Sequence, residues 1–515
     1  MRMETILFSH CRRYPDKEAL ILGDRRVTYR EFGDRVTSIA KALIARGIKP
    51  GDRVVLYLPN CIEFAEGMFG VLAAGAIAVP VTTRLTLSEL TFFCNDCDAK
   101  VVVCDSERAD AIAQDIVGKR TGMLGFSIGG AFGGLEDFAT LRLENDWPLP
   151  SLPLAQDEAA ILYTSGTTGQ PKGVVITHAN LLIQHGFMNG CEWGIGADDR
   201  YLVVTPMAHR AGMGRLVNST MLGGTLCIIP QFDAEEIIST IEREKITVFG
   251  MVPTVCRMLM PAIESHPERC YSLRRIAVTG EAFPVALKKR LIAALPDARL
   301  VSFFGMTEAG GVTYLSHEEQ FTHPEAVGRP SPGVEVRIVS DAGKDVALGE
   351  VGELLVRTGA PGAVTVMKEY FNRPEQTAAA LRDGWFYTGD MAREDADGYI
   401  YIADRKKDMI VSGGFNVYSK EVEQVISEVA GVRDAAVVGI PDDMYGEAVV
   451  AFVERSSEGQ SPDEKAIVEH CRIKIAGYKK PRHVFFIETL PRNATGKVVK
   501  HLLVKDAITA LTRSA

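Results

Sequence analysis

Long hydrophobic runs and an excess of basic residues are two features that this 515-residue chain lacks. No stretch approaches the roughly 20 apolar residues that a membrane span requires, and Met1–Pro15 has no long apolar core typical of a signal peptide. The 57 basic and 66 acidic side chains give a formal charge of −9, which provides no general positive field for nucleic acid. We therefore expect a cytoplasmic protein with no transmembrane segment and no nucleic-acid partner.

Clustered cysteines are lacking as well. Ten cysteines are scattered over the chain, a pattern typical of reduced thiols in a cytosolic protein. Cys94 and Cys97 form a C-x-x-C, but no second pair or histidine cluster accompanies them. We interpret the two as structural residues and not as a metal or redox site.

Most of the chain before Val334 alternates helix-like and strand-like segments. This alternation predicts mostly parallel sheets covered by helices. The glycine-rich run Gly118–Gly134 is interpreted as a surface loop. Expected helices are Tyr29–Arg46, Ile62–Ala74, Ala234–Glu244 and Pro284–Leu295, and expected strands are Arg53–Leu58, Ala76–Val81, Lys100–Cys104, Tyr201–Thr205, Thr225–Ile229 and Thr247–Gly250.

The pattern changes near Val334 to β-like segments, namely Val334–Ser340, Gly352–Arg357 and Tyr399–Ile402, with turn signals at Asp341-Ala342-Gly343 and Asp397-Gly398. After Asp404 it becomes an α+β pattern. We predict an α/β protein of two domains. The large N-terminal domain, residues 1–404, has two sheet-and-helix subdomains plus a β-rich unit. The small α+β C-terminal domain covers residues 405–515.

A loop rich in glycine and hydroxyl groups follows the apolar segment Ala159–Leu162. Glycines let backbone N–H groups converge on an anion, and hydroxyls and a lysine add donors for phosphate oxygens. The spacing is not that of the P-loop. A polar surface turn is the alternative, which the lysine after the proline and the flanking pattern disfavour. The candidate phosphate ligands are Thr164, Ser165, Gly166, Thr167, Thr168, Gly169 and Lys172.

This loop resembles the signature of the adenylate-forming superfamily: acyl-CoA synthetases, peptide-synthetase adenylation domains and beetle luciferases. Four further motifs follow in the family's order, so the resemblance covers nearly the whole chain. The resemblance implies an enzyme that uses ATP, Mg²⁺ and coenzyme A, with a small C-terminal domain that is mobile about a hinge near Lys407.

The second motif adds an aromatic residue and oxygen ligands. A lone carboxylate beside a triphosphate suits Mg²⁺, which prefers hard oxygen ligands. The resemblance implies that Glu308, with Thr167 of the loop, helps to hold Mg²⁺ and that Thr307 contacts phosphate. Gly280 and Glu281 resemble the family's adenine-side loop. The motif consists of Phe304, Gly305, Met306, Thr307 and Glu308.

The third and fourth motifs lie in the second half of the chain. Asp390, after Tyr387-Thr388-Gly389, resembles the family's ribose aspartate, since a carboxylate can accept two hydrogen bonds from a diol. The resemblance implies that Arg405 contacts ribose or phosphate. The Gly413–Gly414 turn resembles the loop beside the pantetheine channel, where a side chain would block the approach.

The fifth motif is Pro491-Arg492-Asn493-Ala494-Thr495-Gly496-Lys497. In the family, the matching lysine reaches the ATP site, so Lys497 is the candidate cation that bridges the acid and the α-phosphate. His209 is a candidate acyl-pocket or orienting residue. Its neighbours Ala208 and Arg210 depart from the family, which has an aromatic before the histidine and an apolar residue after it. Arg210 either faces the acyl pocket or, as we favour, pairs structurally or points to solvent.

The sequence therefore predicts an ATP-dependent acyl-CoA synthetase that converts a carboxylic acid to acyl-AMP and then to its coenzyme A thioester. Three alternatives stay open. One is a stand-alone adenylating enzyme that loads a carrier protein, another a luciferase-type oxidation. The third is a non-catalytic acyl- or nucleotide-binding relative, which Lys497, Glu308 and Asp390 disfavour. The identity of the acid and the oligomeric state, a homodimer included, are not readable from the sequence.

Overall fold

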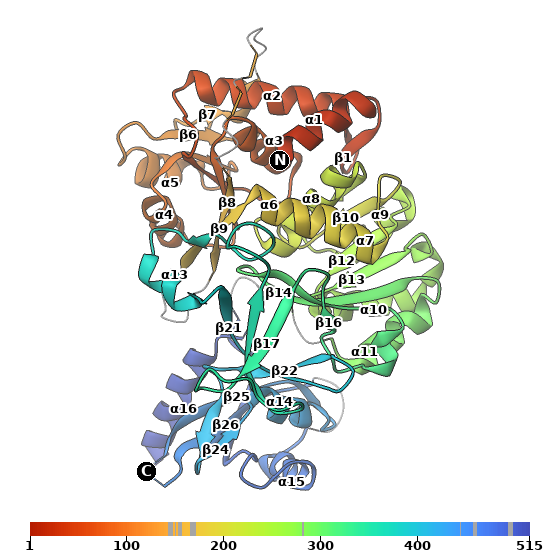
Figure 1. Cartoon of the computed structure of the whole chain (residues 1–515), viewed down its shortest axis with the longest axis vertical. Coiled ribbons are helices and arrows are strands. Elements are labelled where there is room, and N and C mark those ends of the chain that lie inside the picture. Colours follow the sequence, from red (N-terminus) through yellow and green to blue (C-terminus); the bar gives the residue numbers. More distant parts are fainter. Residues whose placement is uncertain are drawn as a thin grey trace. The chain divides into compact units, whose positions relative to one another are not determined.

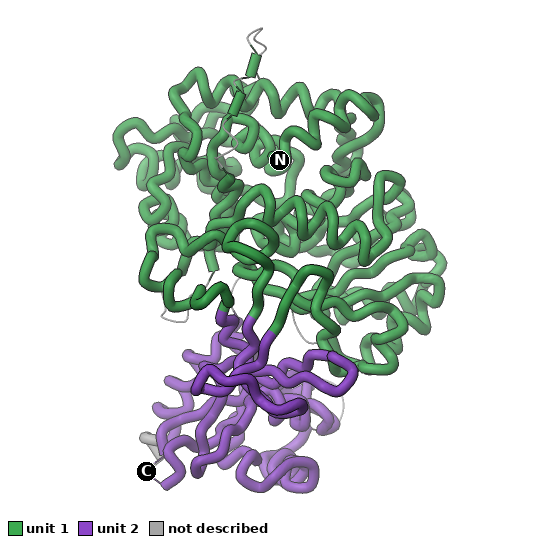
Figure 2. The backbone as a smooth tube through the Cα atoms, in the orientation of Figure 1, with its two compact units in different colours: residues 1–336, 356–386 green, residues 337–355, 387–515 purple. Residues whose placement is uncertain are grey.

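The protein divides into two compact units, shown in different colours in Figure 2. The first comprises Met1–Val336 and Val356–Phe386, and the second Arg337–Leu355 and Tyr387–Ala515. The chain passes between them three times, each time within a strand. The boundary at 404–405 was predicted for the mobile C-terminal domain, and it stays a prediction. The computed structural model describes residues 1–142, 148–149, 151–152, 157–164, 171–280, 283–442, 444–456, 461–492 and 498–514.

The first unit contains an eight-stranded sheet with a buried parallel centre. In spatial order it comprises β19 (Glu369–Tyr370), β9 (Lys172–Thr177), β8 (Glu158–Thr164), β4 (Ile77–Val81), β3 (Arg53–Tyr57), β5 (Ala99–Cys104), β6 (Leu124–Ser127) and β7 (Glu136–Asp137). The strands from β8 to β7 are parallel, whereas β9 runs antiparallel to β8 and β19. All five residues of β4 are buried, which explains its continuous apolar sequence.

A nine-stranded sheet forms the rest of the core of this unit. Its order is β16 (Arg329–Pro330), β15 (Gly310–Leu315), β14 (Arg299–Met306), β13 (Arg275–Val278), β12 (Val248–Met251), β10 (Arg200–Val203), β11 (Thr225–Ile228), β1 (Glu18–Leu22) and β2 (Arg25–Thr28). β10 and β12 are neighbours in this sheet. After β10 the chain continues to β11 on one side of this pair, and after β12 it continues to β13 on the opposite side. The strand order therefore reverses between β10 and β12, and such switch points form crevices at the carboxyl ends of the strands.

Helices of the first unit pack against these sheets, and most of them are labelled in Figure 1. They are α1 (Met3–Arg13), α2 (Tyr29–Ala45), α3 (Ile62–Ala73), α4 (Leu87–Asp96), α5 (Ala109–Ile112), α6 (His178–Leu181), α7 (Asn189–Trp193), α8 (Arg210–Leu222), α9 (Ala234–Glu244), α10 (Pro253–Ser265), α11 (Val285–Ala294), α12 (Glu319–Thr322) and α13 (Pro374–Ala380), with shorter irregular helical turns at Ala113–Val117, Phe138–Arg142, Leu182–Met188 and Pro267–Cys270. α9, α10 and α11 share a core with the nine-stranded sheet, and α4 and α5 share one with the eight-stranded sheet. The capping box of Thr28 and Glu31 fixes the start of α2.

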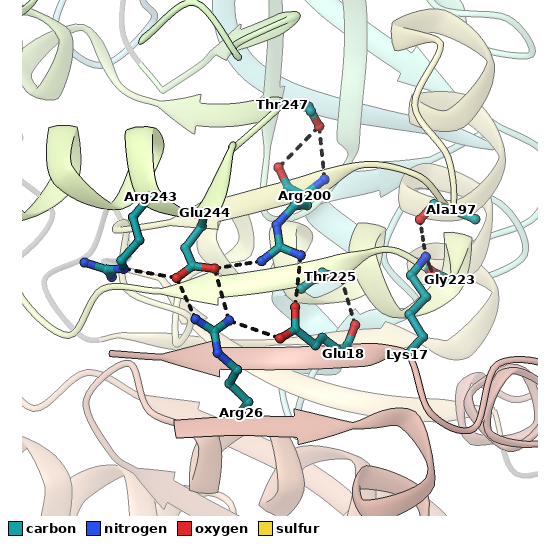
Figure 3. A network of polar contacts seen from close by, with 10 residues as sticks. All are labelled: Lys17, Glu18, Arg26, Ala197, Arg200, Gly223, Thr225, Arg243, Glu244 and Thr247. Carbon is teal, nitrogen blue, oxygen red and sulfur yellow. Dashed lines mark hydrogen bonds and ion pairs between the residues drawn. The ribbon is translucent and has the colours of Figure 1, made fainter. Parts of the chain in front are cut away.

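A network of ion pairs ties the β1–β2 hairpin to the rest of the nine-stranded sheet (Figure 3). At its centre lies Glu244, the last residue of α9, whose side chain is 4% exposed. Its carboxylate accepts from Arg26 at 2.9 Å, Arg200 at 2.8 Å and Arg243 at 3.0 Å. Glu18 pairs with the same Arg26 and Arg200 at 3.1 and 3.0 Å. The hydrogen bonds from Arg26 hold the pKa of Glu244 at about 2.

We expect Glu244→Gln to lower the free energy of unfolding at pH 7 by about 1–2 kcal/mol, because it removes the buried carboxylate that three partly exposed arginines share. The folded-state pKa is depressed, so the contribution is complete above the ordinary value of 4.5 and is lost as the pH falls through about 2. Urea unfolding at pH 7 and at pH 3 measures it. The exposed Glu375→Gln serves as the control, and equal midpoints for the two variants at pH 7 would refute this role.

The second unit is built around two five-stranded sheets, the first of which includes the strands that cross from the first unit. The first has β17 (Glu335–Val339), β18 (Gly352–Arg357), β21 (Trp385–Glu394), β20 (Leu381–Arg382) and β22 (Ile400–Arg405), and the second has β24 (Phe415–Val417), β23 (Ile410–Ser412), β26 (Gly446–Arg455), β25 (Val432–Asp442) and β27 (His483–Ile487). One face of the second sheet shares a core with α14 (Ser419–Ser427) and α15 (Glu464–Lys474), and the other with α16 (Lys500–Ser514).

Two sequence expectations meet a clear outcome. The prediction that Gly118–Gly134 is a surface loop was wrong. The run contains β6, whose Phe126 and Ser127 are buried beside β5. Cys94 and Cys97 are buried in the core, and burial raises the pKa of each thiol to about 12, as suits structural residues. Within the described ranges, no helix has the length and hydropathy of a membrane span, and no three side chains group as metal ligands.

Candidate active site

The hairpin of β8 and β9 brings the two described ends of the glycine-rich loop together. Thr164 ends β8 and pairs directly across the strands with Lys172, which begins β9. The ammonium group of Lys172 lies 5.0 Å from the ring centroid of Tyr370 in β19. The other loop candidates, Ser165, Gly166, Thr167, Thr168 and Gly169, lie outside the described residues. A hydroxyl and a cation thus flank the predicted phosphate loop.

Glu308 meets this hairpin from the turn that follows β14. Its Oε1 accepts hydrogen bonds from the hydroxyl of Tyr370 at 3.3 Å and from that of Thr164 at 3.5 Å. Its backbone carbonyl accepts from the N–H of Met367 at 2.6 Å. Burial and the neighbouring carboxylate raise the pKa of Tyr370, so its hydroxyl remains a donor at neutral pH. The structure therefore unites Thr164, Lys172 and Glu308, residues of two separate sequence motifs.

Two polar side chains, Arg210 and Gln184, support the backbone of the second motif. The guanidinium of Arg210 donates to the carbonyl of Thr307, and Gln184 accepts from the N–H of Gly311 at 2.6 Å. Burial lowers the pKa of Arg210 to about 10, while the charge of Glu308 acts in the opposite direction. Arg210 thus pairs structurally with the motif, the interpretation that we favoured from the sequence.

Glycines of the motifs sit where a side chain would not fit. A Cβ on Gly305 would lie 2.2 Å from the carbonyl oxygen of Gly310 across the β14–β15 hairpin. Gly280, just after β13, has a φ of +97°, a conformation that favours glycine. Phe304 and Met306 are half-buried in β14 on either side of Gly305. Glu281 lies outside the described residues.

His209 ends the short loop between β10 and α8 and is the N-cap residue of α8. Its N–H donates to the carbonyl of Pro206 at 3.0 Å, and its carbonyl accepts from the N–H of Met213 at 2.8 Å. These contacts fix the backbone where β10 turns into α8. The side chain of His209 is half-buried.

A small, partly open cavity lies at the switch point of the nine-stranded sheet: the space between its walls, open solvent included, is about 250 Å³, of which about 10 Å³ admits the centre of a water molecule. Three of the segments named above border it: the turn into α8, the segment before Gly280 and the strand that leads to Glu308. It is lined by Thr205, Ala211, Arg215, Gly250, Met251, Val252, Ala277, Thr279 and Phe303. Its position at the carboxyl ends of β10, β12 and β13 is where ligands bind in open α/β sheets.

The second unit holds the remaining described candidates. Asp390 is 1% exposed and forms an ion pair with Arg405, Oδ1 to Nε, at 2.6 Å across β21 and β22. Its N–H donates to the hydroxyl of Thr388, which in turn donates to the carbonyl of Leu354. Asp390 and Arg405, which the resemblance assigned to binding ribose and to binding ribose or phosphate, are therefore neighbours, and their ion pair holds both side chains in place.

The Gly413–Gly414 turn joins β23 to β24. Both glycines have positive φ, +60° and +81°, as a two-residue hairpin turn of this type requires. A Cβ on Gly414 would have no atom within 4 Å, so the turn is open. The exposed apolar side chains of this unit include Val411, Phe415, Met444, Tyr445 and Tyr478, and Phe415 stacks on Tyr478 with 4.7 Å between ring centroids. Lys497 lies outside the described residues.

Sequence reasoning missed three residues of the first unit that matter here. Tyr370 carried no motif, and only its place in β19 brings it to Glu308. Gln184 and Arg215 sit in segments that gave no chemical signal beyond ordinary helix. An arginine in an otherwise small and apolar helical stretch, as in Arg215, was the one signal available.

The fold and these motifs define an AMP-binding enzyme. Residues 7–371 match the family model described as AMP-binding enzyme, and residues 421–497 match the AMP-binding enzyme C-terminal domain. The chain belongs to this family, so the resemblance inferred from the five motifs is confirmed.

Named relatives point to the same chemistry. A long-chain-fatty-acid–CoA ligase of Mycobacterium tuberculosis is 38% identical over 93% of each chain. Feruloyl-CoA synthase of Amycolatopsis is 36% identical over 94% of this chain and 95% of its own. The crystal structure of ATP-bound MatB from Rhodopseudomonas palustris matches with a TM-score of 0.89 at 30% identity, over 98% of this chain and 99% of that one. The protein is an AMP-forming acid–CoA ligase that uses ATP and coenzyme A.

Proposed function

We propose that the protein activates a carboxylic acid at the cluster of Thr164, Lys172, Glu308 and Tyr370. In the first half-reaction a carboxylate oxygen attacks the α-phosphorus of ATP, and pyrophosphate leaves. In the second, the thiol of coenzyme A attacks the acyl carbonyl, and AMP leaves. The meeting of Glu308 with the phosphate-loop hairpin is the observation that carries this assignment, because it places donors and an acidic group where phosphates would bind.

Mg²⁺ fits the same cluster. One carboxylate flanked by two hydroxyl groups suits a cation that keeps most of its ligands as water and substrate phosphate. Glu308 would hold it together with Thr167, and the ion would neutralise charge on the polyphosphate. The residues of the chain bind and orient the substrates: Lys172 offers a cation, and Asp390 offers a carboxylate to the ribose.

The two half-reactions need different partners at one reacting centre. We infer that the small C-terminal domain, residues 405–515 with a hinge near Lys407, presents Lys497 for adenylation and the Gly413–Gly414 turn for thioester formation. The open turn and the exposed aromatic side chains around it support a role beside the pantetheine arm.

We expect Gly414→Leu to slow thioester formation from supplied acyl-AMP by about 10²-fold and to spare adenylation, because the side chain would occupy the channel. Leucine at a φ of +81° is also strained, so a control must carry the same strain. Gly398→Leu does so, since Gly398 has a φ of +81° and a Cβ there would meet only one atom, at 3.8 Å. Equal losses in the two variants, measured by single turnover, would assign the effect to strain.

Acid-dependent exchange of labelled pyrophosphate into ATP tests the proposed function. A panel of aliphatic, aromatic and dicarboxylic acids should reveal at least one acid that drives exchange without coenzyme A. Addition of coenzyme A should then yield the thioester. If a phosphopantetheinylated carrier protein accepted the acyl group and coenzyme A did not, the carrier-loading alternative would replace this function. No exchange with any acid would reject adenylation. The cytoplasmic location expected from composition stays a prediction.

A further inference from the structure

Arg215 is a buried cation in the second turn of α8. The residue is 3% exposed, and its guanidinium lies 4.6 Å from the centroid of the Trp193 ring. On another side it lies against β12, where a Cβ on Gly250 would be 2.9 Å from both its Cδ and its Nη1. The glycine at this position therefore leaves room for the guanidinium beside the strand.

No anion balances this cation within the part of the chain that the structure describes. Arg215 forms no ion pair or hydrogen bond there, and its Nε is a buried donor without an acceptor. Burial lowers the pKa of Arg215 to about 10, and Tyr201 offsets this only in part. Buried charges in proteins are normally paired, so a buried unpaired arginine indicates a missing partner.

Arg215 borders the cavity at the switch point. Arg215 and Ala211, one turn apart on the same face of α8, both line it. Thr279 and Phe303 also line the cavity, and each directly precedes a nucleotide motif. The hydroxyl of Thr279 donates a hydrogen bond to the carbonyl of Phe303 at 3.1 Å. An acid whose reacting carboxylate lay at the nucleotide would therefore extend its tail toward Arg215.

We propose that Arg215 determines the acid that this enzyme takes, by binding a second carboxylate at the far end of a dicarboxylic substrate. The inference rests on the proposed function, since it assigns the cavity to the acyl group. The planar guanidinium can donate two parallel hydrogen bonds to a carboxylate, and the ring of Trp193 behind it holds its plane. An unbranched apolar tail would bury the same cation against methylene groups and is disfavoured.

The test compares matched acids in pyrophosphate exchange: pentanoate with glutarate, hexanoate with adipate, and octanoate with suberate. The wild-type kcat/KM should favour the dicarboxylate in at least one pair by more than tenfold. Arg215→Met should lower kcat/KM for that dicarboxylate by about 100-fold, the scale of losing one buried charge contact, and leave or raise that for its monocarboxylate. Arg215→Lys should retain part of the preference, because it keeps the charge and loses the planar fork.

Two further variants separate specificity from structure. Arg210→Met, at the other arginine of α8, should lower exchange with both acids of a pair alike, because Arg210 supports Thr307. The exposed Arg257→Met should change neither. Equal losses for mono- and dicarboxylate in Arg215→Met, or no dicarboxylate preference in the wild type, would overturn the proposal.

A binding measurement keeps the inference apart from the proposed function. The dicarboxylate should raise the thermal midpoint of the wild type and not that of Arg215→Met, whose own midpoint should equal or exceed the wild-type value. A ligand shift without any pyrophosphate exchange would reject the proposed function alone. Exchange with other acids, with no shift by any of the three dicarboxylates, would reject the role of Arg215 alone.

Discussion

Lys497→Ala should lower the rate of acyl-adenylate formation by about 10²–10³, the effect of removing one charged contact from a developing transition state. The lysine would bridge the carboxylate and the α-phosphate as charge redistributes. Thioester formation from supplied acyl-AMP should stay near the wild-type rate, because the α-phosphate is then no longer under attack. Rapid-quench assays of each half-reaction measure both rates.

Lys505→Ala is the matched control for this variant, since Lys505 is an exposed lysine on α16, in the same terminal region of the chain. It should leave both half-reactions unchanged. Together with Gly414→Leu, the lysine variant tests whether two parts of the C-terminal domain serve two steps. If Lys497→Ala and Gly414→Leu each slowed both half-reactions equally, alternation between two orientations would be wrong for this protein.

Glu308→Gln should reduce adenylation by about 10²-fold or more and shift its dependence on Mg²⁺ concentration, because the variant keeps the shape and loses the charge. The hydroxyls of Thr164 and Tyr370 now donate to Oε1, and an amide oxygen can accept the same bonds. The site should therefore keep its geometry, and the thermal midpoint should change little. Initial rates across a Mg²⁺ titration give the result.

Glu369→Gln is the control for the loss of charge, because Glu369 is an exposed carboxylate next to Tyr370 in β19. It should leave the rate and the Mg²⁺ dependence as in the wild type. Unchanged turnover and an unchanged Mg²⁺ requirement in Glu308→Gln would remove Glu308 from the metal site.

Elements with a clear hydrophobic pattern could be predicted well from the sequence. The strand Gly352–Arg357 and the helix Ala234–Glu244 have the predicted bounds, because a continuous apolar run and a strong 3.6-residue period each have one good explanation. β6 was missed because it is short, contains Gly125 and lies in a glycine-rich run that looks like a loop. It is defined by pairing with β5, a contact between distant segments that no local pattern reports.

Some residues of the site could also be predicted from the sequence, and others could not. Glycines and the acidic and basic motif residues could be found, since phosphate binding demands those residue types at close spacing. Tyr370 could not, because a lone tyrosine acquires a role only where β19 meets β9. Arg210 and Arg215 show the limit most clearly. The sequence marked Arg210 as unusual, yet it pairs with a backbone carbonyl, whereas Arg215 is the one that lines the cavity.

The stoichiometry of a single reaction mixture tests the central claim most directly. Enzyme, ATP and an acid that supports exchange are mixed, first without and then with coenzyme A, and pyrophosphate, AMP and thioester are counted. We predict a burst of one pyrophosphate per active site without coenzyme A, followed with it by steady turnover that yields one AMP and one thioester for each pyrophosphate. Release of ADP and phosphate, or thioester formed without AMP, would contradict activation through an acyl-adenylate.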